Sequence, residues 1–161
     1  MTKTLFFDIE TAPNMAYVWG QWQQDVIEHA REWYMLCFSY KWEGEKTTHV
    51  VSLEEFDLYS SDPENDFHVV EKLWELLDEA DVVIGHNSDA FDIKKANARF
   101  AYHDLGPTSH YQTVDTLKIA RRHFKFNSNR LGHLGEHLGL GGKETTGGFQ
   151  TWAGCMRGDV K

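Results

Sequence analysis

The sequence has little that would place it in a membrane or in an oxidising compartment. Its 161 residues include only two cysteines, Cys37 and Cys155, which lack the spacing of metal ligands. No apolar stretch approaches the length of a bilayer span, and no signal-peptide core follows the N-terminal residues. We therefore expect a cytoplasmic protein with reduced thiols, acting as a monomer and without a membrane partner.

The chain also lacks the positive net charge that is typical of nucleic-acid-binding proteins, because 25 acids and 16 bases give a net charge of −9. The distribution is uneven. Residues 1–93 contain 20 acids and 5 bases, whereas residues 94–161 contain 5 acids and 11 bases. An acidic site with a basic flank suits a metal-dependent enzyme that acts on phosphodiesters. Such segregation is also common in α/β domains, so this support is mild.

Hydrophobic patterning predicts one α/β domain over residues 1–161, because 41% of the residues are hydrophobic and strands alternate with helices. Strands are expected at 3–9, 34–42, 46–52, 82–84 and 112–114, and helices at 66–79, 91–102, 115–124 and 129–138. A short helix could form over residues 25–31, and the glycine-rich tail 139–161 is expected to be irregular. An antiparallel hairpin followed by alternating helices and strands predicts a mixed sheet covered by helices.

Two acids stand together at the end of the first expected strand. Asp8 and Glu10 flank Ile9, and since side chains alternate along a strand, both carboxylates point to the same face. They repel each other unless a cation lies between them, and carboxylate oxygens suit Mg²⁺ and Mn²⁺. An acidic loop exposed to solvent is the alternative for such an isolated pair.

A third acid follows the strand at 82–84, in the segment Gly85-His86-Asn87-Ser88-Asp89-Ala90-Phe91-Asp92. If that strand lies next to the first one, Asp92 comes near Asp8 and Glu10, at the sheet edge where α/β proteins hold ligands. The alternative is that Asp89 or Asp92 only caps the following helix.

Together the two segments resemble the DEDD (DnaQ-like) 3′–5′ exonuclease superfamily, which has an RNase H-like fold. Phe7-Asp8-Ile9-Glu10-Thr11 resembles its first motif, and the segment from Gly85 to Asp92 resembles its second, in which an Asn precedes a Phe-Asp pair. Val114-Asp115-Thr116-Leu117 resembles a segment between the second and third motifs. The resemblance covers about residues 3–140.

The resemblance implies two divalent metal ions, Mg²⁺ or Mn²⁺, bound by the catalytic acids Asp8, Glu10 and Asp92. Asp8 would bridge the metals, Glu10 would bind one and orient water, and Asp92 would complete the site. Water would then cleave the 3′-terminal phosphodiester of single-stranded DNA, or less certainly of RNA, and release a nucleoside 5′-monophosphate. Substrate contacts are expected from Thr11, His86, Asn87, Phe91, Arg121 and Arg122.

The third motif of the family, Tyr-x-x-x-Asp or a His variant on the last helix, is missing after residue 140. Tyr111 and His110 match it formally with Asp115. A strand separates such side chains by about 13 Å, whereas one helical turn brings them to about 6 Å. We therefore expect Asp115 to cap the next helix.

Three explanations of the missing motif stay open. The chain is cut short, or it is complete and impaired, or Asp159 or another acid substitutes. Low activity is expected from this chain. Two other functions compete with an exonuclease: a catalytically inactive nucleic-acid-binding relic of the same fold, and an RNase H-like structure-specific endonuclease.

Two further groups have open roles. The basic face of the helix at 115–124, which includes Arg121 and Arg122, either faces solvent, as is usual, or contacts phosphates. Trp19 and Trp22 either stack on bases or pack their loop against the sheet, and we slightly favour packing.

Overall fold

A five-stranded mixed sheet forms the centre of the part of the chain that the computed structural model describes, residues 2–22, 25–142 and 147–159. The strand order is β5-β4-β1-β6-β7. The strands are β1 (Thr4–Thr11), β4 (Met35–Trp42), β5 (His49–Ser52), β6 (Val82–Gly85) and β7 (Gln112–Asp115). β4 is antiparallel to β1 and β5, while β6 is parallel to β1 and β7. The architecture is consistent with the RNase H-like fold, so the predicted fold class is confirmed.

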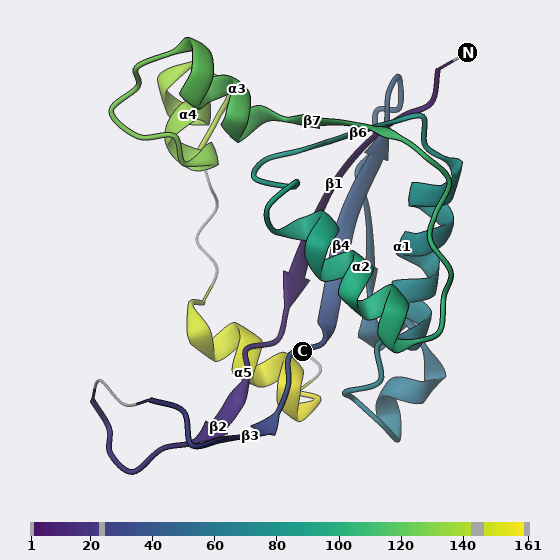
Figure 1. Cartoon of the computed structure of the whole chain (residues 1–161), viewed down its shortest axis with the longest axis vertical. Helices are drawn as coiled ribbons and strands as arrows, with labels where there is room; N and C mark the ends of the chain where they lie inside the picture. The colour runs from purple at the N-terminus through teal and green to yellow at the C-terminus, as the bar shows by residue number, and fades with distance from the viewer. Residues whose placement is uncertain (1, 23–24, 143–146, 160–161) are drawn as a thin grey trace.

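Helices flank this sheet, and Figure 1 shows that those at residues 116–137 are set off to one side of it, beyond the end of β7. The helices are α1 (Phe67–Glu79), α2 (Asp92–Tyr102), α3 (Thr116–His123), α4 (Leu131–His137) and α5 (Phe149–Arg157), with short 3₁₀ turns η1 (Leu53–Glu55) and η2 (Asp57–Ser60). α1 buries a stripe at helical spacing that consists of Val69, Val70, Leu73, Leu76 and Leu77. In the described part of the chain, no helix is both long and apolar enough to cross a membrane.

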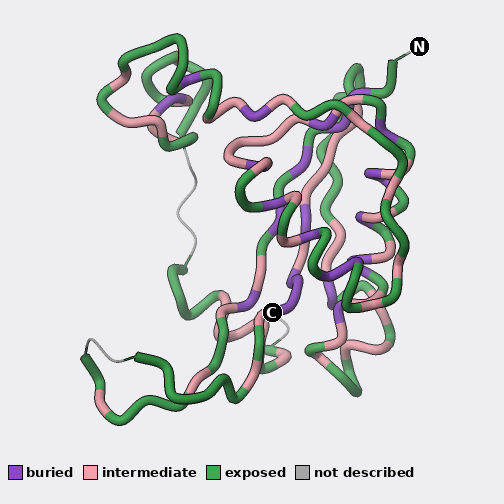
Figure 2. Tube along the Cα trace, in the orientation of Figure 1, coloured by how far each residue is buried: buried purple, intermediate pink, exposed green. Residues whose placement is uncertain are grey.

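The core lies between β1, β4 and the helix pair α1 and α2. Along β1 the buried side chains Leu5, Phe7 and Ile9 alternate with the exposed residues Phe6, Asp8 and Glu10. The apolar face of β1 joins a cluster that includes residues of α1 and α2. Figure 2 shows the buried residues concentrated along the central strands and α1, whereas the region of α3 and α4 is mostly exposed. The acidic face of β1 is therefore the face turned away from this core.

Two predicted segments differ from the structure. Residues 28–31, where a short helix was considered, form strand β3 (Glu28–Arg31), which pairs with β2 (Met15–Tyr17) in a separate two-stranded ribbon. In the tail that was expected to be irregular, α5 forms a helix, so that prediction is wrong for its residues. α5 packs Trp152, Cys155 and Met156 against the core. Residues 143–146 and 160–161 of the tail lie outside the described residues.

The two tryptophans before β3 are exposed. Trp19 exposes 89% and Trp22 exposes 77% of its surface, so the prediction that they pack their loop against the sheet is wrong.

Candidate functional site

The end of β1 presents two carboxylates on the open face of the sheet. Asp8 and Glu10 are exposed, whereas Ile9 between them is 3% exposed. On the neighbouring strand β4 they stand opposite Ser39 and Cys37. Burial is the main cause that raises the pKa of the Cys37 thiol to about 11, and the charges of Glu10 and Asp8 contribute to the rise. The carboxylate charges of β1 therefore act on the neighbouring strand as well.

A tight turn follows β6 and leads to Asp92, the third acid. Asn87 adopts the left-handed conformation with φ of 66°, a conformation that asparagine tolerates better than most residues. The Asn87 carbonyl accepts the amides of Ala90 and Phe91, and the Ser88 carbonyl accepts the amide of Ile93. α2 consequently begins at Asp92, directly beside the end of β1.

Gly85 is required where β6 enters this turn. A Cβ there would lie 2.6 Å from Ser88 Cβ and 3.3 Å from the Phe7 carbonyl oxygen. We predict that Gly85→Ala lowers the free energy of unfolding by about 1–3 kcal/mol, because a crowded site must shift to accept a methyl group. Gly106→Ala is the control, since a Cβ at that position would have no neighbouring atom within 4 Å. Urea unfolding of both variants tests this prediction, and equal effects would contradict it.

The Asp92 carboxylate reaches the strand that carries the other two acids. Its Oδ1 accepts the Ile9 amide at 3.1 Å, and Asp92 is only 3% exposed. β6 pairs with β1 only over Thr4 to Phe6, so Asp92 occupies the edge of β1 beyond the end of this pairing. Burial is the main cause that raises the pKa of Asp92 to about 6; the Ile9 hydrogen bond acts in the opposite direction, and the charges of Asp8 and Glu10 contribute to the rise. The three acids that the sequence singled out thus lie together.

A broad cavity of about 1580 Å³ borders these acids, and α3 and α4 form its far side. Of the predicted site residues it is lined by Asp8, Glu10, His86, Asn87, Phe91, Asp92 and Arg121. Thr11 and Arg122 are not among its lining residues. Thr11 ends β1 opposite Met35, and Arg122 is exposed on α3.

His86 has a structural role that the sequence did not reveal. Its Nε2–H donates to the Asn129 carbonyl at 2.9 Å, and its Nδ1 lies 2.9 Å from Thr116 Oγ1. Thr116 starts α3, and Asn129 comes just before α4. His86 therefore ties the turn after β6 to both helices that form the far side of the cavity.

Asp115 has the capping role that the sequence predicted. Its Oδ1 accepts the amides of Leu117 at 2.9 Å and Lys118 at 3.4 Å, and also the Asn87 amide at 2.9 Å. It is 5% exposed. Asp115 thus holds the turn after β6 to α3, and it is not the missing acid of the third motif.

The basic face of α3 is partly neutralised. Lys118 Nζ lies 2.5 Å from Asp89 Oδ2. Although burial raises the pKa of Asp89, hydrogen bonds from Lys118 and Thr113 lower it more, so it stays below the usual value. Of the two arginines that were predicted to contact the substrate from this face, Arg121 lines the cavity.

Asp159 is not brought to the acidic cluster. Its Oδ2 accepts the Arg157 guanidinium at 2.8–2.9 Å, and it does not belong to the residues that line the cavity. It is therefore no evident substitute for the fourth acid.

The three acids fit a divalent cation by their chemistry, although they do not form a complete cage. Among the described residues, no group of three His, Cys, Asp or Glu side chains is arranged as a ready metal site. Mg²⁺ commonly takes only one or two carboxylates and completes its shell with water and substrate phosphates. Burial first, and the charges of Asp8 and Glu10 second, raise the pKa of Asp92, and a bound cation would relieve the repulsion between these charges.

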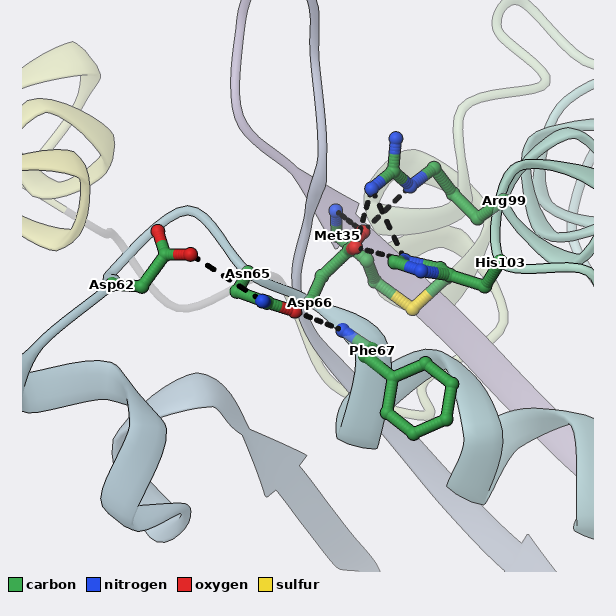
Figure 3. A network of polar contacts seen from close by, with 7 residues as sticks. All are labelled: Met35, Asp62, Asn65, Asp66, Phe67, Arg99 and His103. Carbon is green, nitrogen blue, oxygen red and sulfur yellow. Dashed lines mark hydrogen bonds and ion pairs between the residues drawn. The ribbon is translucent and has the colours of Figure 1, made fainter.

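The sequence did not single out a buried charge network that holds α2 in place. Asp66, just before α1, is fully buried and accepts bonds from the Met35 amide at 2.7 Å, Arg99 Nε at 2.8 Å and His103 Nε2 at 2.6 Å (Figure 3). Arg99 lies in the last turn of α2, and His103, four residues later, is the C-cap of this helix. The four-residue spacing of these two basic residues is visible in the sequence, but nothing in the sequence identified Asp66 as their partner.

Comparison with solved structures identifies a similar fold in a DNA polymerase. The structure of the family B DNA polymerase from the hyperthermophilic archaeon Pyrobaculum calidifontis matches 95% of this chain with a TM-score of 0.66 and 15% sequence identity. The chain corresponds to 21% of that polymerase chain, and at this identity the likeness shows the fold alone. No protein-family model and no curated protein matches the sequence.

Proposed function

We propose that this chain is a metal-dependent 3′–5′ exonuclease domain that hydrolyses the terminal phosphodiester of single-stranded DNA. The observation that carries the proposal is the hydrogen bond from the Ile9 amide to Asp92, which puts three carboxylates at one end of β1. The occurrence of the same fold within a DNA polymerase supports a function in nucleic-acid processing.

Each group at the site has a role in this proposal. Asp8, Glu10 and Asp92 hold Mg²⁺ or Mn²⁺. Two such ions would stabilise the entering and the leaving oxygen during in-line attack by water. Phe91, which is 41% exposed at the cavity, offers a ring on which the terminal base can stack. Arg121, on the far side of the cavity, supplies a positive charge for the backbone.

A catalytically inactive nucleic-acid-binding protein is the second candidate. It is favoured by the pairing of Asp159 with Arg157, since Asp159 does not line the cavity with the three acids. Three carboxylates hold a cation less tightly than four would, so the exonuclease proposal includes slow turnover.

Manganese titration and a cleavage assay test the proposal together. We expect the chain to bind Mn²⁺ calorimetrically and Asp8→Asn to weaken binding by at least about tenfold, because even outer partners of metal ligands contribute that much. Asp57→Asn, at an exposed acid in η2, is the control. Slow release of nucleoside 5′-monophosphate from linear single strands, abolished by Asp8→Asn, is the expected cleavage.

Other outcomes of these assays favour the competing functions. Cleavage of a circular single strand would indicate an endonuclease, since an exonuclease needs an end. Mn²⁺ binding that Asp8→Asn leaves unchanged would contradict the proposed site. Binding of a single strand with neither Mn²⁺ binding nor cleavage would favour the inactive protein.

A further inference from the structure

A lysine held against aromatic rings lies one helical turn beyond the acidic cluster. Lys95 follows Asp92 by three residues on α2, which is about 4.5 Å along the helix axis. Its Nζ lies 3.5 Å from the centre of the Trp33 ring and 5.7 Å from that of Phe91. Among the ion pairs of the described residues, none includes Lys95, although the half of the chain before it is strongly acidic.

The position of Trp33 fixes this cation beside the strand that carries the acids. The Trp33 amide donates to Asn14 Oδ1 at 2.9 Å, and the Ala12 amide donates to the Tyr34 carbonyl at 2.9 Å. Trp33 is thus held against the segment that follows β1. The Lys95 side chain therefore extends from α2 to the segment that follows β1.

The surroundings of Lys95 keep it available for an anion. Burial lowers its pKa, and no carboxylate contributes to the shift in the opposite direction. Arg99, the other cation near Trp33, is already neutralised because it donates twice to Asp66. A partly dehydrated ammonium on aromatic rings retains its attraction for a phosphate, since the rings offer only a weak cation–π contact.

We propose that Lys95, supported by Trp33, binds a backbone phosphate of single-stranded nucleic acid whose end lies at Asp8, Glu10 and Asp92. The inference rests on the proposed function for the placement of the strand end. Phe91 precedes Asp92 and lines the cavity, and its ring centre is 5.7 Å from the Lys95 ammonium, which is not itself part of the cavity lining. A base stacked on Phe91 would then have its neighbouring phosphate within reach of Lys95.

Anisotropy titration of a short 5′-fluorescein-labelled oligothymidylate in EDTA tests this proposal without metal or cleavage. Lys95→Met removes the charge but keeps an unbranched apolar stem for Trp33. We expect it to weaken binding about fivefold at low salt and to reduce the slope of log K against log salt by about 0.7, the value for one phosphate contact on a single strand. Lys95→Arg should retain most of the affinity.

The matched control is Lys94→Met, which removes the same charge from an exposed position on the same helix. Equal effects at the two lysines, an unchanged salt slope for Lys95→Met, or no binding by the unmodified chain would overturn the proposal. Mn²⁺ titration of the same preparation keeps the two proposals apart. Oligonucleotide binding that depends on Lys95, without Mn²⁺ binding, would support this subsite and contradict the nuclease proposal. Mn²⁺ binding together with oligonucleotide binding that does not depend on Lys95 would support the metal site and contradict this subsite.

Discussion

Asp66→Ala is expected to lower the free energy of unfolding by about 3–5 kcal/mol, the usual cost of removing one partner of a buried ion pair. Asp66 is fully buried, and its two oxygens accept bonds from a backbone amide, a guanidinium and an imidazole (Figure 3). Without it, Arg99, which is only 9% exposed, keeps a charge that neither water nor an acid stabilises. Most of the expected loss of stability thus comes from the charge of Arg99, which stays buried without its partner.

Urea unfolding at neutral pH measures this loss. Glu75→Ala removes an acid from the exposed face of α1, where it pairs with Lys72, and should change stability by less than about 1 kcal/mol. The double variant Asp66→Leu with Arg99→Met should recover much of the loss, because it leaves no buried charge unpaired. A cost for Asp66→Ala that is no larger than that of Glu75→Ala would show that the network does not stabilise the fold.

Asp92→Asn is expected to have opposite effects on stability and on metal binding. The pKa of Asp92 lies at about 6 instead of the ordinary 3.8, so its ionised form is disfavoured in the folded chain. Well below pH 3.8 both folded and unfolded states hold the proton and there is no cost. As the pH rises towards 6 the unfolded chain ionises first, stability is lost, and above 6 the full cost remains. Removing the charge should therefore stabilise the metal-free chain by about 2–3 kcal/mol at pH 7.

Unfolding of the original chain and of Asp92→Asn between pH 4 and 8 tests this expectation. The difference between them should grow from a small value at the acid end to its plateau above pH 6. An asparagine oxygen can still accept the Ile9 amide, so the hydrogen bond is retained. Mn²⁺ should stabilise the original chain and leave Asp92→Asn almost unchanged. If Asp92→Asn is less stable at every pH, the ionised form of Asp92 is not disfavoured in the folded chain.

Alternating and helical patterns made most of the fold predictable. β1 alternates buried and exposed side chains, and α1 buries the stripe expected from its spacing. The same alternation placed Asp8 and Glu10 on one face. The capping role of Asp115 also followed from its position at the start of a helix.

Segments stabilised by distant partners were the ones mispredicted. β3 exists because it pairs with β2, and Arg31 at its end forms an ion pair with Glu64. α5 has glycine at its centre and little helical propensity of its own, but Trp152 packs it onto the core. On α2, Arg99 is buried against Asp66, a distant partner that the sequence did not indicate.

The sequence by itself determined the class of fold and the residues of the candidate acidic site, because side-chain period and chemical type are local properties of a chain. Only the tertiary structure decided that Asp92 bonds to the edge of β1, that Asp66 neutralises Arg99 and that Lys95 lies on an aromatic ring. These pairings join residues far apart in the chain, and their energies depend on burial and distance, which exist only once the strands and helices have packed together.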